Sequence, residues 1–189
     1  MSNYKENLKQ IIKKYDLVSP KVLSIGGQVD DRGYFNKTEV EFFRVLDNDT
    51  QFNPDVVWDM NKSITDTEGG DVLFDHYNTY DAVLALNLWE YIFDPVTAHK
   101  NIKFFLKQGG LYMGSYVFVY GKHNPAGTDY LRYTDDGIRK ILTAAAFKDI
   151  QIHPIISNDL LTTYYESEGL RIRKDIDHNV AGYFVTARS

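Results

Sequence analysis

Four short runs of mostly apolar residues constrain the fold of this chain more than any other feature of its sequence. They lie at residues 21–26, 41–47, 56–60 and 80–86, and each gives way to glycine, aspartate or asparagine. Short runs of this kind are typical of strands buried on both faces, as in a parallel sheet with helices on either side. The sequence therefore predicts an α/β domain built on a parallel sheet.

Helical segments alternate with these strands. Residues 3–17 carry apolar side chains at helical spacing, residues 95–107 begin with proline after a capping aspartate, and Thr134 can cap a third helix. Such alternation predicts a Rossmann-like, doubly wound fold in a single domain, residues 1–189, with its N-terminal helix within 1–20. Further strands are expected at 111–119, 150–156 and 180–187. The last two form an antiparallel hairpin, which gives a mostly parallel seven-stranded sheet.

Composition excludes several classes of protein and site. The chain has no cysteine, so it contains no disulfide, thiolate metal site or cysteine nucleophile, and we expect no metal centre. Its formal net charge of −5 argues against a nucleic-acid partner. No apolar run approaches the roughly 20 residues that span a bilayer, and the polar N-terminus does not resemble a signal peptide. We therefore expect a cytoplasmic protein without a membrane partner.

The carboxyl ends of the predicted strands mark the expected ligand site, because ligands of doubly wound folds bind at this edge. Gly26 and Gly27 follow the first strand, where glycine allows the backbone to approach a ligand. The dinucleotide pattern G-x-G-x-x-G is absent, and Asp30 and Asp31 follow instead. These carboxylates would repel a pyrophosphate and favour a ligand with ammonium and sulfonium charges. This favours S-adenosylmethionine (SAM) over NAD as the cofactor.

The other strand ends can be assigned to parts of this cofactor. Asp47 ends the second strand and can accept both ribose hydroxyls, although a solvated turn residue is the alternative. Asp59 can accept the adenine amine while Met60 packs on the ring, or it is an ordinary loop aspartate. The residues after the fourth strand would face the methionine moiety. The cofactor residues expected are Gly26, Gly27, Asp47, Asp59, Met60, Asn87 and Leu88.

The order and spacing of these features resemble the class I SAM-dependent methyltransferases, in particular their broad type 11 group. The matching segments are VLSIGG at 22–27, NLWEYIFDP at 87–95, LKQGGLYMGS at 106–115 and HNPAGTDYLRYT at 123–134, together with Asp47 and Asp59. The resemblance covers roughly residues 21–150 and implies a SAM-dependent methyltransferase.

This chain departs from the family pattern in three places. Ser24 replaces the acid of the first loop, and Tyr91 replaces the histidine that follows the fourth strand. Only a short stretch links Gly27 to the second strand, so the first helix of the fold must be short or irregular.

The loop after the fifth strand is the expected acceptor site, because it lies at the same sheet edge as the loop after the fourth strand. His123 is a candidate general base, and Glu90 borders the same space, so these two are the candidate catalytic residues. The residues expected to contact the acceptor are Tyr91, Asp129, Tyr130, Arg132 and Tyr133. An ion pair of Asp129 with Arg132 that fixes the loop is the structural alternative.

We expect the acceptor to be a small molecule or a glycan, methylated on oxygen or nitrogen. The motif Asn/Asp-Pro-Pro-Tyr/Phe of amino-methylating DNA enzymes is absent after the fourth strand. Residues 157–179 are long for a hairpin connection and are expected to form a lid or an interface, which leaves a homo-oligomer open. The alternative function is a catalytically silent protein of the same fold that serves as a partner or scaffold.

Overall fold

The computed structural model describes residues 2–27, 29–35, 40–66, 70–119, 121–122, 127–156 and 180–189. The helices are α1 (Ser2–Lys13), α2 (Pro95–Phe105) and α3 (Asp135–Ala144). The strands are β1 (Lys21–Ile25), β2 (Phe42–Asp47), β3 (Val56–Val57), β4 (Tyr80–Ala85), β5 (Leu106–Val117), β6 (Lys148–Ile156) and β7 (Val180–Arg188). The 3-10 helices are η1 (Val29–Tyr34), η2 (Thr50–Phe52), η3 (Ile64–Asp66), η4 (Gly70–His76) and η5 (Trp89–Tyr91).

The strands form one seven-stranded sheet in the order β3-β2-β1-β4-β5-β7-β6. The pairings of β1 with β2 and β4, of β2 with β3, and of β4 with β5 are parallel. β7 lies between β5 and β6 and runs antiparallel to both. This confirms the predicted mostly parallel sheet with a closing antiparallel pair.

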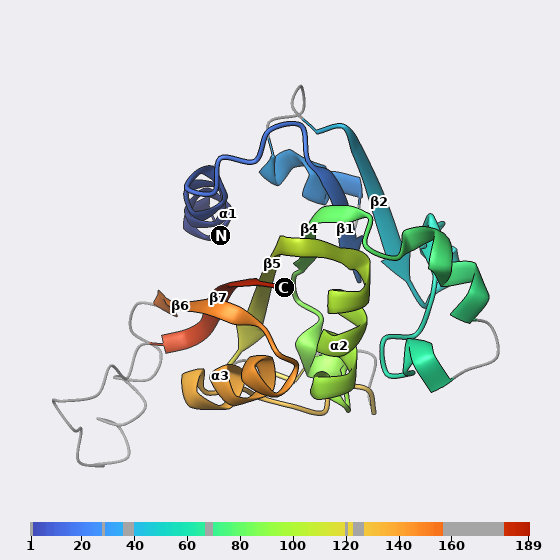
Figure 1. Ribbon diagram of the computed structural model, residues 1–189. Helices are drawn as coiled ribbons and strands as arrows, with labels where there is room; N and C mark the ends of the chain where they lie inside the picture. The colour runs from blue at the N-terminus through green and yellow to red at the C-terminus, as the bar shows by residue number, and fades with distance from the viewer. Residues whose placement is uncertain are drawn as a thin grey trace, which may run out of the picture.

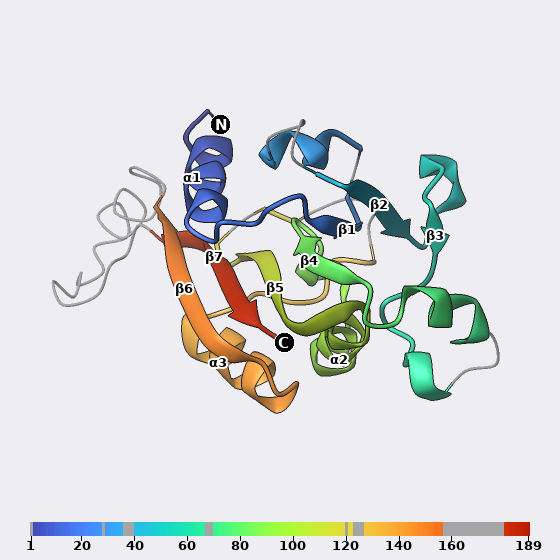
Figure 2. The ribbon, with the colours of Figure 1, turned by 45° about the horizontal axis from the view of Figure 1, so that its top comes forward.

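Helices cover both faces of this sheet, with α1 on one face and α2 and α3 on the other (Figures 1 and 2). Successive side chains of a strand point to opposite faces. Val22 and Ala82 therefore pack in the core beneath α1, whereas their neighbours Leu23 and Val83 pack with α2 and α3. Among the described residues, no helix is long and apolar enough to cross a bilayer.

Two helix caps confirm their predicted start points. The Asp94 carboxylate accepts a hydrogen bond from the Thr97 backbone N–H at 3.0 Å, and the Thr134 hydroxyl accepts one from the Gly137 N–H at 3.2 Å. The region between β1 and β2 contains only η1 among its described residues, which agrees with the expected short or irregular first helix.

Two predicted helix ends are wrong, and tertiary pairing explains one of them. The first helix ends at Lys13, before residues 14–17. The second ends at Phe105, because Leu106 already pairs with Tyr80 of β4. Gly109 and Gly110, which follow the predicted helix 95–107 in the sequence, lie within β5, where Gly109 has φ +73°.

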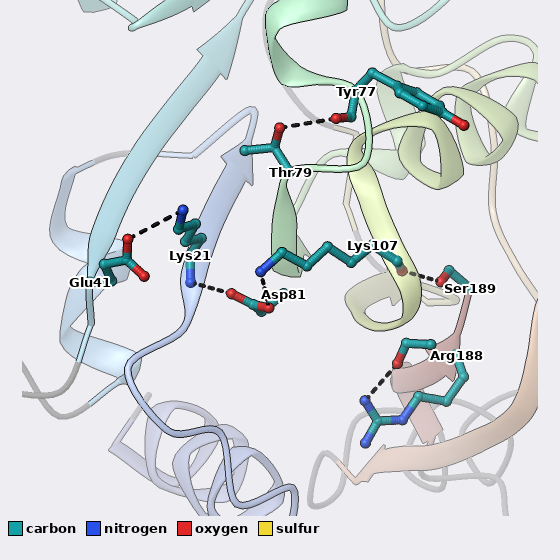
Figure 3. A network of polar contacts seen from close by, with 9 residues as sticks. Lys21, Glu41, Tyr77, Thr79, Asp81, Lys107, Arg188 and Ser189 are labelled. Carbon is teal, nitrogen blue, oxygen red and sulfur yellow. Dashed lines mark hydrogen bonds and ion pairs between the residues drawn. The ribbon is translucent and has the colours of Figure 1, made fainter.

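The amino edge of the sheet is closed by a polar network centred on Asp81 (Figure 3). One Asp81 carboxylate oxygen accepts from the Lys21 backbone N–H at 2.8 Å, and the other accepts from Lys107 Nζ at 2.7 Å. Ser189 donates its hydroxyl to the Lys107 carbonyl at 2.6 Å, and Lys21 Nζ lies 3.2 Å from Glu41. Polar groups at this edge therefore join the starts of β1, β4 and β5.

A hydrogen-bonded set of rings lies buried between α2 and β5. The Pro95 carbonyl can only accept, so His99 donates from Nδ1, and Nε2 of the neutral ring then accepts from the Tyr116 hydroxyl at 2.7 Å. Tyr112 donates in turn to Tyr116 at 2.6 Å. The Trp89 ring stacks on His99 with centroids 3.8 Å apart. The helix, the strand and η5 are thereby joined through one polar stack.

We expect His99 to make stability depend on pH. Burial lowers the pKa of His99 to about 3, whereas an unfolded histidine titrates near 6.5. Between these values the unfolded chain binds the proton and the folded chain does not, so stability is lost as pH falls through this window. The slope should reach about 1.4 kcal/mol per pH unit. Urea unfolding of wild type and His99→Asn between pH 4 and 6 checks it.

The difference between the two proteins isolates this histidine, because every other titrating group is shared. The wild-type free energy of unfolding should fall more steeply than that of the variant. In the folded wild type, the His99 ring resonance should not titrate above pH 4 by NMR. Parallel slopes together with a titration near pH 6 would show that the ring is not held neutral.

Candidate functional site

The ends of β1, β2 and β3 are joined side by side at the carboxyl edge of the sheet. The Gly26 backbone N–H donates to the Leu46 carbonyl at 2.8 Å, and the Trp58 N–H donates to the Asp47 carbonyl at 3.1 Å. These bonds place Gly26, Asp47 and Asp59 along one line at this edge. The structure therefore brings together residues that the sequence predicts to bind one ligand.

The end of β4 adjoins the same line on the other side of β1. Gly26 has φ +64°, and a Cβ atom on it would lie 2.8 Å from Leu88 Cδ1. Asn87 also has a positive φ, +50°, and its side chain is exposed. The Asn87 backbone N–H donates to Ser115 Oγ of β5 at 2.9 Å, so a buried serine fixes this strained turn. β1 and β4 flank the point where the strand order reverses, at which doubly wound folds bind ligands.

Asp47 and Asp59 are half-buried, and local hydrogen bonds orient both carboxylates. Asp47 Oδ1 accepts from the Asp49 backbone N–H at 2.9 Å. Asp59 Oδ1 accepts from the backbone N–H and the side-chain amide of Asn61, at 3.0 and 3.1 Å. Each carboxylate is thus held at the edge in a fixed orientation.

Met60 does not lie at the surface of this edge. Its side chain is only 3% exposed and packs in the core beneath α2. The Met60 carbonyl accepts from the Asn101 side chain of α2 at 3.4 Å, and Asn101 also bonds the Lys62 carbonyl at 2.7 Å. Met60 therefore packs in the core and does not face a cofactor ring as predicted, because hydrogen bonds from Asn101 hold this segment against α2.

Sequence reasoning missed a contact beneath the glycine loop. The buried Ser24 hydroxyl donates to Asp31 Oδ2 at 2.9 Å. A Cβ atom on Gly27 would overlap both of these oxygen atoms. Asp31, seven residues after Ser24, therefore brings a carboxylate against the end of β1, beside the serine that replaces the expected acid. The sequence alone does not predict this hydrogen bond, because the direction of the Asp31 side chain depends on the conformation of η1.

The acceptor side of the edge is built from η5 and the segment before α3. The Tyr130 backbone N–H donates to the Glu90 carbonyl at 2.7 Å, which ties the two segments together. The Arg132 guanidinium makes two bonds to Asp129, one of them from NH2 to Oδ2 at 2.8 Å. The Asp129 side chain is 1% exposed, and this bond raises the pKa of Arg132. The ion pair of Asp129 with Arg132 that the structural alternative requires is therefore present.

Two of the predicted acceptor-side residues are buried. Glu90 is fully buried, so it supports the loop from beneath and does not face an acceptor. Tyr133 is also buried, and its hydroxyl donates to the Trp89 carbonyl at 2.7 Å. Burial and the Glu90 carboxyl both raise the pKa of Tyr91 and Tyr133, so neither phenol serves as a base near neutral pH.

Of the remaining acceptor-side candidates, two are accessible and one lies outside the described residues. Tyr130 is exposed and Tyr91 is half-buried, so both are accessible at this side of the edge. His123, the candidate base, lies outside the described residues, as does the segment 157–179. Among the described residues, no group of three or more His, Asp or Glu side chains could hold a metal ion.

Known proteins match this chain in structure and not in sequence. No protein-family model matches it, and no curated protein does. The CurJ carbon methyltransferase superposes with a TM-score of 0.65 at 12% identity, over 97% of this chain and 53% of that one. A SAM-dependent methyltransferase from Archaeoglobus fulgidus gives 0.63 at 14% identity, over 100% and 94% of the two chains.

A third structure carries ligands. The 1,6-didemethyltoxoflavin-N1-methyltransferase of Burkholderia thailandensis, with 1,6-didemethyltoxoflavin and S-adenosylhomocysteine bound, superposes at 0.59 with 16% identity, over 98% of this chain and 77% of that one. This chain spans about half the length of the CurJ protein and most of the length of the other two. It has the fold of the class I SAM-dependent methyltransferases.

The packing beneath Gly27 gives a test of the loop. Gly27→Ala should lower the free energy of unfolding by roughly 1–3 kcal/mol, because the added methyl group displaces Ser24 or Asp31. Gly33→Ala in η1 is the matched control, since a Cβ there meets nothing within 4 Å. Thermal unfolding of both variants decides the matter, and equal melting temperatures would show that the loop does not close on Ser24 and Asp31 as described.

Proposed function

We propose that this chain is a SAM-dependent methyltransferase that transfers a methyl group to an oxygen or nitrogen of a small-molecule or glycan acceptor. The observation that carries the proposal is the position of two turns, at Gly26 and Asn87, both at positive φ and both at the point where the strand order reverses. Asp47 lies at the neighbouring strand end. The methyltransferase fold adds support, since the structural neighbours depend on SAM.

The residues at this edge fit the parts of SAM. The exposed backbone at Gly26 and the Asn87 side chain suit the methionine portion, and the Asp31 carboxylate beneath Gly27 supplies negative charge for its ammonium group. Asp47 would accept the ribose hydroxyls, and Asp59 the exocyclic amine of adenine. When bound, SAM supplies an activated methyl group, whose bond to sulfur breaks as the acceptor atom bonds the carbon and loses its proton.

The chain's own residues mainly align the acceptor and exclude water. The bond from Tyr130 to the Glu90 carbonyl and the Asp129–Arg132 pair hold the acceptor loop over the edge. Tyr91 and Tyr130 are the accessible side chains there, and Glu90 and Tyr133 position them from below. His123 remains the proposed base for an acceptor that must lose a proton during transfer.

Ligand-dependent melting tests the function. SAM and S-adenosylhomocysteine should raise the melting temperature and NAD should not, because carboxylates occupy the loop where a pyrophosphate would bind. A ligand at 100 times its Kd adds about 2.7 kcal/mol, and each kcal/mol shifts the melting temperature of a chain this long by roughly 2–4 °C. Stabilisation by NAD alone would overturn the proposed cofactor.

The ribose contact has its own test. Asp47→Ala should weaken S-adenosylhomocysteine binding by about ten- to a hundredfold, since a buried charge-assisted pair is worth roughly 1.5–3 kcal/mol. Asp75→Ala, which removes an exposed aspartate from η4, is the matched control and should bind as wild type does. Isothermal titration calorimetry measures both, and equal affinities would mean that the ribose lies elsewhere.

A further inference from the structure

Two exposed aromatic rings meet at the carboxyl edge: Phe93 lies between η5 and α2, and Tyr130 lies in the segment before α3. Phe93 is 73% exposed and Tyr130 is 49% exposed. Their centroids lie 5.7 Å apart with the planes at 80°, so one ring stands edge-on to the other. We call Phe93 and Tyr130 the aromatic corner. Sequence reasoning selected Tyr130 and passed over Phe93.

Hydrogen bonds of the main chain fix the backbone at both residues. The Phe93 N–H donates to Asn61 Oδ1 at 2.7 Å, and Asn61 in turn bonds the Asp59 carboxylate. The Tyr130 N–H donates to the Glu90 carbonyl at 2.7 Å. Through Asn61, the aromatic corner is linked to Asp59, a proposed cofactor residue, and through Tyr130 it is linked to Glu90.

The exposure of these rings calls for a ligand. A single apolar side chain on the surface is ordinary, but Phe93 contacts a second exposed ring, and the backbone of both residues is fixed by hydrogen bonds. A fixed backbone lowers the conformational entropy that the two rings lose when they bind a flat apolar face. Because the planes of Phe93 and Tyr130 stand at 80°, one ring can stack on the flat face of a ligand while the other contacts the edge of that ligand.

We infer that Phe93 and Tyr130 bind the ring of the methyl acceptor, so that the acceptor carries a six-membered ring with a flat apolar face. This inference rests on the proposed function and names the substrate class of the same site. An aromatic ring and a pyranose share this chemistry. An open-chain acceptor lacks it, since it presents no rigid face to the corner.

Ring binding can be measured without knowing the natural acceptor. The probes are phenol, methyl β-D-xylopyranoside and the open-chain polyol xylitol, which carries similar hydroxyl groups without the ring. Saturation-transfer NMR at millimolar probe measures binding to wild type, Phe93→Ala, Tyr130→Leu and Phe74→Ala. Phe74 is the matched control, because it is 59% exposed and lies on η4. Each titration is run with and without S-adenosylhomocysteine.

At least one ring probe should bind wild type and Phe74→Ala alike and bind Phe93→Ala and Tyr130→Leu at least fivefold more weakly, as the loss of one stacking contact predicts. Xylitol should show no such difference. Phenol and the xyloside together distinguish an aromatic from a sugar acceptor. The inference is overturned if no ring probe binds wild type, or if the Phe93 and Phe74 variants bind equally.

The outcome for the cofactor is separate from the outcome for the ring. Failure of S-adenosylhomocysteine to bind any of the proteins would count against the proposed function, while the ring titrations without it would still test the corner. Normal binding of S-adenosylhomocysteine with no effect of Phe93→Ala would remove the ring-binding role alone.

Discussion

The parallel pairing of β1 with β2 on one side and β4 on the other is the constraint on which the rest of the structure depends. After β1 the chain continues to β2 on one side, and after β4 it continues to β5 on the opposite side, so the loops after these two parallel strands diverge. Gly26 and Asn87 take up positive φ at this point because the backbone must turn sharply there. The proposed cofactor site lies at this point of the carboxyl edge, and Asp47 and Asp59 lie along the same edge.

The other side of that edge depends on a buried polar stack rather than on the sheet. Trp89 lies on His99, which shares a hydrogen bond with Tyr116, while Tyr133 bonds the Trp89 carbonyl. The His99 ring nitrogens and the Tyr116 and Tyr133 hydroxyls all find partners inside the core, whereas the buried Trp89 ring N–H has no hydrogen-bond partner among the described residues. Rigid support beneath η5 allows exposed side chains such as Tyr130 to be held in place above it. The stack therefore links the stability of the core to the geometry of the acceptor side.

Sequence periodicity predicted the strands, the sheet and the caps at Asp94 and Thr134, because these depend on local pattern. It failed where long-range packing decides the outcome. Leu106 joins a strand because Tyr80 is there to pair with it, and Met60 turns inward because Asn101 of α2 binds its carbonyl. At the site, position along the chain identified the strand ends, but it could not tell which side chains of the acceptor loop are buried. Two contacts of the site join residues that only folding brings together. Ser115 Oγ accepts from the Asn87 N–H, and the Ser24 hydroxyl donates to Asp31.

The central claim is that one nucleoside cofactor lies along the carboxyl edge from Asp59 to Asn87. A crystal structure of the chain with S-adenosylhomocysteine tests this most directly. We expect the ribose hydroxyls on Asp47, the adenine beside Asp59 and the homocysteine portion over Gly26 and Asn87. A nucleoside bound at the amino edge near Asp81, or at the carboxyl edge in the reverse direction with its adenine over Gly26, would contradict the account.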